Sequence, residues 1–158
     1  DLHSFPTRRS SDLGNLQIDV QYDAFPFPIR FNGTIDRVEQ RGEDIYIVDY
    51  KSGIVEKGQV ALNEKKWENL IVDYDYSKAF QLLMYAYLLF KTGMIGEDKR
   101  VYVGNYSFRR LKLGFIGFRN GKDKDISPVD THVRDAFEQK LIQLLKEIYD
   151  PALPFVEK

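Results

Sequence analysis

The sequence predicts an α/β domain in which several β-strands and two long helices share one core. Three observations indicate this fold class. Apolar and polar residues alternate over residues 16–22, which is typical of a half-buried strand. Residues 45–50 are rich in β-branched and aromatic side chains, which favour strands. Apolar positions between Val133 and Ile148 follow helical spacing, which predicts an amphipathic helix.

Three strands are predicted in the first third of the chain. The first, residues 16–22, ends before residues 24–28, where two prolines cannot donate hydrogen bonds to a ladder. A second strand is predicted over residues 30–40 and a third over residues 45–50. The intervening residues 41–44 predict a type II′ hairpin turn, because glycine stands at the first central position.

A long polar connection and a buried helix follow. Residues 54–77 show no clear periodicity, and such a long connection is typical of a functional or mobile segment. Ser77 is predicted to cap a helix over residues 78–92, which ends at Gly93. Because this helix is apolar nearly all round, we expect it to be buried.

The last part of the chain predicts more strand and a second long helix. Residues 101–118 are rich in β-forming residues and predict two strands, broken near Arg109 and Arg110. A charged turn over residues 120–125 precedes a helix that opens at Ser127-Pro128 and runs to Tyr149.

Composition excludes several classes of protein. The 158 residues contain no cysteine, so a disulfide framework, a cysteine zinc site and a cysteine nucleophile are excluded within them. No apolar run is long enough to span a bilayer and no secretory leader opens the chain, so we expect a cytoplasmic protein without a membrane partner. The net charge of −1 means that any nucleic-acid binding depends on local patches.

The first residues of the chain are predicted to be foreign to it. Residues 1–13, DLHSFPTRRSSDL, match the translation of a common sequencing adapter, and the alternative is a natural basic arm. We interpret them as adapter-derived and expect no function for His3, Arg8 and Arg9. The native part is then residues 14–158, cut at its upstream side.

The predicted hairpin carries the strongest chemical signal. Pairing around Gly42-Glu43 places Asp36 opposite Asp49, and side-chain alternation puts Lys51 on the same face as Asp49. Opposed carboxylates are destabilising unless a cation lies between them, and oxygen ligands of this kind suit Mg²⁺ or Mn²⁺. The alternative is an exposed strand end with a solvated salt bridge between Lys51 and one aspartate. The cross-strand aspartate and the apolar residues before Asp49 favour the metal site.

Two polar side chains on the first long helix extend this site. Gln81 and Tyr85 are four residues apart and therefore share one helix face. They are predicted to face the hairpin and to hold a scissile phosphate or a metal-bound water. The alternative is a core glutamine bonded to main chain, with Tyr85 as ordinary packing.

A basic group is the last candidate surface. It can track a phosphate backbone, or it can be the protective charge of solvated strand edges. Its members are Arg109, Arg110, Lys112, Arg119, Lys122 and Lys124, interleaved with Phe108, Phe115 and Phe118. His132 is interpreted as an ordinary residue of a first helical turn.

Three segments together resemble a known family. They are residues 33–38 (GTIDRV), 47–53 (IVDYKSG) and 81–87 (QLLMYAY). Their order and spacing are similar to the GxxDR, DYKxG and QxxxY elements of the PD-(D/E)XK nuclease superfamily, in particular the RecB-type (AddB-like) nuclease domains of bacterial helicase–nuclease repair machines. The likeness covers roughly residues 16–155. It implies a restriction-endonuclease-like core, with a central mixed β-sheet flanked by helices.

The resemblance also implies an activity and a role for each site residue. It implies a Mg²⁺- or Mn²⁺-dependent deoxyribonuclease, acting as an exonuclease or endonuclease by in-line attack of metal-activated water on a phosphodiester. Asp36 and Asp49 correspond to the metal-binding carboxylates, with the main-chain carbonyl of Tyr50 as a further ligand. Lys51 corresponds to the catalytic lysine, and Gln81 and Tyr85 to the substrate-organising pair.

The chain departs from the family pattern at both ends. The helix that usually precedes the first strand and completes the metal site is missing, and adapter residue His3 is no substitute for it. Many relatives continue beyond a segment like residues 150–155 into a cysteine cluster that binds iron–sulfur, which is expected only in a longer parent protein. The implied partners are DNA and a helicase domain or subunit. The alternatives are a catalytically inactive DNA-binding or scaffold module, and a CRISPR-associated or mobile-element nuclease of the same superfamily.

Overall fold

A four-stranded mixed sheet forms the centre of the computed structural model, which describes residues 15–153. Its strand order is β3-β4-β6-β7. β3 (Arg37–Arg41) pairs antiparallel with β4 (Asp44–Lys51), β4 pairs parallel with β6 (Arg100–Ser107), and β6 pairs antiparallel with β7 (Ile116–Gly117). The predicted α/β class with a central mixed sheet is therefore confirmed. The segment 1–13, assigned above to an adapter, lies outside the described residues.

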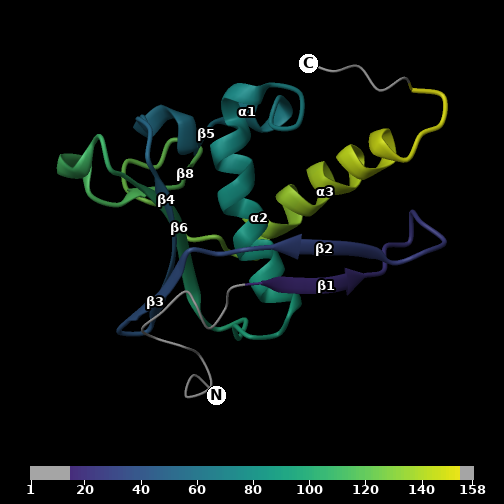
Figure 1. The fold of residues 1–158 in the computed structure, drawn as a ribbon, viewed down its shortest axis with the longest axis horizontal. Coiled ribbons are helices and arrows are strands. Elements are labelled where there is room, and N and C mark those ends of the chain that lie inside the picture. The colour runs from purple at the N-terminus through teal and green to yellow at the C-terminus, as the bar shows by residue number, and fades with distance from the viewer. Residues whose placement is uncertain (1–14, 154–158) are drawn as a thin grey trace.

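Helices and a strand ribbon pack around this sheet. The long helix α2 (Ser77–Lys91) packs against β4 and β6, and α3 (Thr131–Ile148) packs against α2 (Figure 1). Four short strands and a short helix complete the fold: β1 (Leu16–Val20) with β2 (Ile29–Gly33), β5 (Ala61–Leu62) with β8 (Arg119–Asn120), and α1 (Glu64–Glu68). In the described part of the chain, β1 comes first and no helix precedes it.

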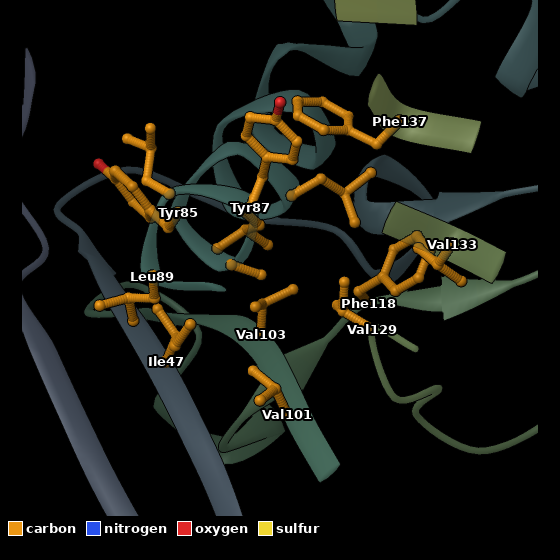
Figure 2. Packing of buried hydrophobic residues seen from close by; sticks show 14 of the residues in the cluster. Ile47, Tyr85, Tyr87, Leu89, Val101, Val103, Phe118, Val129, Val133 and Phe137 are labelled. Carbon is orange, nitrogen blue, oxygen red and sulfur yellow. The ribbon is translucent and has the colours of Figure 1, made fainter. Parts of the chain in front are cut away.

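The core lies between the sheet and the two long helices. Ile47 of β4 and Val101 and Val103 of β6 are almost completely buried beneath α2. Figure 2 shows Phe137 of α3 against Tyr87 of α2, and their ring centroids are 5.7 Å apart. Strand alternation therefore directs one face of the sheet into a common core with both helices.

The hairpin predicted from residues 41–44 is confirmed. Arg41 pairs with Asp44, so Gly42 and Glu43 form a two-residue loop. Gly42 has a φ of 62°, and no non-glycine residue among those described has a positive φ. A positive φ at the first central position alone is the type II′ geometry that glycine permits.

The single strand predicted over residues 30–40 was wrong, because the chain forms two strands there. β2 ends at Gly33 and belongs to a ribbon with β1, whereas β3 begins at Arg37 and belongs to the central sheet. Between them the side chain of Ile35 is buried, with 1% of its surface exposed. The break follows Gly33, and glycine weakens the interior of a strand. After this residue the chain leaves the β1–β2 ribbon and enters the central sheet.

The segment 54–77 is also more ordered than its sequence suggested. It contains two short 3₁₀ turns (Lys57–Val60 and Tyr74–Tyr76), β5 and α1. Val55, Val60 and Leu62 are completely buried, and β5 pairs with β8 far along the chain. Local periodicity could not reveal pairing over that sequence distance.

Both helix starts differ from the prediction. Ser77 is the first helical residue of α2 rather than its cap, because the 3₁₀ turn at residues 74–76 leads directly into the helix. α3 begins at Thr131 rather than near Pro128, because the side chain of Asp130 accepts a hydrogen bond from the main-chain nitrogen of Val133 at 2.9 Å. The predicted break between β6 and β7 is confirmed, although β7 is much shorter than expected.

None of the helices within residues 15–153 combines the length and the apolar composition needed to cross a membrane.

Candidate active site

The open end of the β3–β4 hairpin brings the two predicted carboxylates together. The ladder ends at the pair Arg37–Val48, so Asp36 stands just before β3 rather than inside it. Its Oδ2 accepts a hydrogen bond from the main-chain nitrogen of Tyr50 at 2.9 Å. This bond replaces the next rung of the ladder and holds Asp36 beside the end of β4.

Asp49 is the buried centre of the site. Only 4% of its surface is exposed, and its Oδ2 lies 2.8 Å from Nζ of Lys51. Burial raises the pKa of Asp49, Lys51 acts in the opposite direction, and the nearby charge of Asp36 raises it further. The net direction is upward, so the site holds a carboxylate whose negative charge is incompletely compensated.

Lys51 connects this carboxylate to α2. Its Nζ donates to Oε1 of Gln81 at 2.7 Å, and Nε2 of Gln81 donates to the hydroxyl of Tyr85 at 2.8 Å. The Tyr85 hydroxyl lies 3.5 Å from Oδ1 of Asp49, which closes a ring of four side chains. The alternative of a core glutamine bonded to main chain is therefore wrong, because the Gln81 amide bonds to Lys51 and Tyr85.

Tyr85 contributes a hydroxyl that stays protonated. Burial first, and the charges of Asp49 and Asp36 next, raise the pKa of Tyr85 to about 12. In Figure 2 its oxygen points away from the packed hydrophobic side chains, unlike that of Tyr87, which lies near Phe137. At neutral pH Tyr85 is therefore a hydrogen-bond donor at the edge of the core.

The ring opens into a pocket with a volume of about 470 Å³. Its lining consists of Lys51, Tyr74, Ser77, Lys78, Phe80, Gln81, Met84 and Tyr85. The ammonium of Lys51 and the amide of Gln81 thus meet a space large enough for part of a substrate. This arrangement can bind an anionic group next to a buried carboxylate.

The donor set at the hairpin end fits a hard divalent cation. Among residues 15–153, one oxygen of each carboxylate is weakly engaged: Oδ1 of Asp49 has the 3.5 Å contact with Tyr85, and Asp36 uses Oδ2 for its bond to Tyr50. The carbonyl of Tyr50 is directed to the same side of β4 as its nitrogen, which faces Asp36. Within residues 15–153 no cluster of three or more histidine, cysteine, aspartate or glutamate side chains occurs. Water and substrate oxygens would therefore complete the coordination, as is common for Mg²⁺.

Asn105 is a site residue that sequence reasoning missed. It pairs with Asp49 across the parallel strands, is completely buried, and donates from Nδ2 to Oδ2 of Asp49 at 3.1 Å. Its Oδ1 is buried without a hydrogen-bond partner among the described residues. An amide between buried positions of a strand was the available signal, because a buried amide needs partners.

Part of the predicted basic group lies together, since Phe115, Arg119 and Lys124 line one pocket, while other members have separate surroundings. Phe118 is completely buried in the core, and Arg110 forms an ion pair with Glu56 at 3.0 Å. Phe108, which is 58% exposed, stacks on Tyr50 with 5.8 Å between ring centroids. His132 is an exposed residue of the first turn of α3, as expected.

The stability of Asp49→Asn relative to that of the unchanged protein is expected to increase as the pH rises. The raised pKa of Asp49 favours the folded state below the ordinary value of 3.8, and this contribution is lost as the pH rises through the folded-state pKa. The free energy of unfolding of Asp49→Asn, minus that of the unchanged protein, should therefore increase across this window and then level off. Denaturant titrations at several pH values measure this difference. A difference that stays constant from pH 3.8 to neutrality would contradict the assignment.

A family model described as the PD-(D/E)XK nuclease superfamily matches residues 5–158. No curated protein and no solved structure matches the chain.

Proposed function

Because the chain belongs to the PD-(D/E)XK nuclease superfamily, we propose that it hydrolyses DNA phosphodiester bonds with Mg²⁺ or Mn²⁺ at the end of β4. The observation that carries the proposal is the ring of Asp49, Lys51, Gln81 and Tyr85, open to a pocket on one side. The ring places a cation, an amide and a hydroxyl beside a buried carboxylate. A fixed cation and fixed hydrogen-bond donors can stabilise the negative charge that develops on a phosphate during hydrolysis.

Each residue of the site has a distinct task in this proposal. Asp36, Asp49 and the carbonyl of Tyr50 would hold the divalent cation, which when bound acts as a Lewis acid and lowers the pKa of water. Lys51 orients the attacking water and offsets negative charge on the phosphate. Gln81 fixes the Lys51 ammonium, Tyr85 fixes the Gln81 amide, and both side chains can donate to substrate oxygens. Asn105 holds the Asp49 carboxylate in place from β6.

The biological context is a further part of the proposal. The segments 33–38, 47–53 and 81–87 resemble RecB-type domains, which supports a role in a cytoplasmic DNA repair or recombination machine with a helicase partner. The resemblance is compatible with an exonuclease or an endonuclease. The retention of Asp36, Asp49 and Lys51 disfavours an inactive scaffold module.

The experiment that tests this proposal is cleavage of end-labelled linear DNA and RNA, single- and double-stranded. We expect DNA products with Mg²⁺ or Mn²⁺ and none after EDTA, because the two carboxylates need a cation to approach a phosphate. Restoring the metal after EDTA should restore cleavage. DNA binding without cleavage under any metal would instead favour the inactive scaffold, and cleavage that persists in EDTA would exclude the proposed chemistry.

A further inference from the structure

The site pocket continues into a second, apolar pocket along the start of α2. This second pocket has a volume of about 540 Å³ and shares Tyr74, Ser77 and Phe80 with the site pocket. Its other lining residues are Leu70, Ile71, Val72, Asp73 and Leu144. The two pockets thus form one groove, with the Lys51 ammonium at one end and, at the other, mostly apolar side chains together with the Asp73 carboxylate.

Tyr74 stands where the two pockets meet. It is 88% exposed, more than any other large hydrophobic residue among those described. The 3₁₀ turn at residues 74–76 fixes its backbone: the Asp73 side chain accepts from the nitrogen of Asp75 at 2.9 Å, and the nitrogen of Tyr76 donates to the carbonyl of Asp73 at 3.1 Å. An exposed aromatic side chain therefore stands on an ordered turn and lines the same pocket as the proposed catalytic lysine.

Along the groove, cationic side chains are followed by an aromatic ring, in the order in which a nucleotide presents its phosphate and its base. Lys78 adds a second ammonium to that of Lys51 in the lining of the site pocket. Beyond these cations come the Tyr74 ring and then Val72, which is 51% exposed. Ammonium groups attract the negative charge of a phosphate, and an exposed aromatic ring can stack on the flat face of a base.

We propose that this groove is a nucleotide subsite in which Tyr74 stacks on an unpaired base while Lys78 and Lys51 face the adjacent phosphates. The inference rests on the proposed nuclease function and adds its substrate class, a single-stranded segment or a frayed end. Bases inside a duplex are covered by their neighbours, so the Tyr74 ring reaches only a base that has left the stack.

The test compares the binding of two labelled single strands in EDTA, where no cleavage is expected. One is a short oligothymidylate and the other is an abasic strand with the same number of phosphates. Stacking on Tyr74 should make the unchanged protein bind oligothymidylate at least about fivefold more tightly. Tyr74→Ala should reduce this ratio to near one, whereas Tyr74→Phe should keep it because the ring remains.

A matched control is Phe27→Ala, which removes another exposed aromatic, outside both pockets. It should leave the ratio unchanged. The subsite is excluded if the ratio survives in Tyr74→Ala, or if the unchanged protein binds both strands equally. Metal-dependent cleavage of the same oligothymidylate tests the function separately: cleavage without a binding ratio refutes only the subsite, and a ratio without cleavage refutes only the nuclease proposal.

Discussion

Lys51→Ala is expected to reduce metal-dependent DNA cleavage by at least about a hundredfold, the magnitude typical of losing a positioned proton-transfer or charge-stabilising group. Within the ring of four side chains, Lys51 alone carries positive charge, and it contacts both Asp49 and Gln81. Its removal leaves the buried carboxylate uncompensated and opens the ring. Initial rates on labelled linear DNA at saturating metal measure the effect.

Lys99→Ala is the matched control for this variant. Lys99 forms an ion pair with Glu43 at 3.0 Å, next to the hairpin turn at the opposite end of β4. The Lys99→Ala variant is expected to cleave DNA at the rate of the unchanged protein. A circular dichroism melt of both variants separates lost chemistry from lost folding. Equal rates for Lys51→Ala and Lys99→Ala, with both proteins folded, would remove Lys51 from the mechanism.

Phe137→Ala is expected to cost about 3–5 kcal/mol of folding free energy, because it empties a fully buried aromatic position. Phe137 is 1% exposed and lies against Phe80 and Tyr87, with ring centroids 5.2 Å and 5.7 Å away. These contacts join α3 to α2, and α2 carries Gln81 and Tyr85. Denaturant unfolding measures the loss, and cleavage should decline at temperatures where the variant unfolds.

Ile148→Ala provides the control on the same helix. Ile148 is 48% exposed at the end of α3, so its truncation should change stability by no more than about 0.5 kcal/mol. Similar losses for the two variants would show that α3 does not pack through Phe137 as described.

Local sequence patterns predicted the hairpin and most of the candidate site. Gly42 defined the turn, and counting outward from it placed Asp36 beside Asp49 because antiparallel register is set by the turn. Helical spacing placed Gln81 and Tyr85 on one face, and the structure brings that face to Lys51. Each of these relations spans few residues or follows from a fixed period.

The features that sequence reasoning missed depend on contacts between distant segments. Asn105 meets Asp49 only because β4 and β6 pair in parallel, and no local pattern sets the register of such a pair. The order within residues 54–77 likewise depends on β5 pairing with β8. Local patterns also do not predict that Tyr74 lies beside Lys51. The two residues line one pocket because the turn before α2 is brought to the end of β4.

The most direct test of the proposed active site is the rate of DNA cleavage in Mn²⁺ by Asp49→Asn and Asp44→Asn, two substitutions of the same kind in one strand. Asp49 lies at the buried end of β4, whereas Asp44 pairs with Arg100 at the other end. We predict that Asp44→Asn cleaves like the unchanged protein and that Asp49→Asn, although folded, yields no product above the EDTA background. Undiminished cleavage by folded Asp49→Asn would contradict a metal-dependent nuclease site at the end of β4.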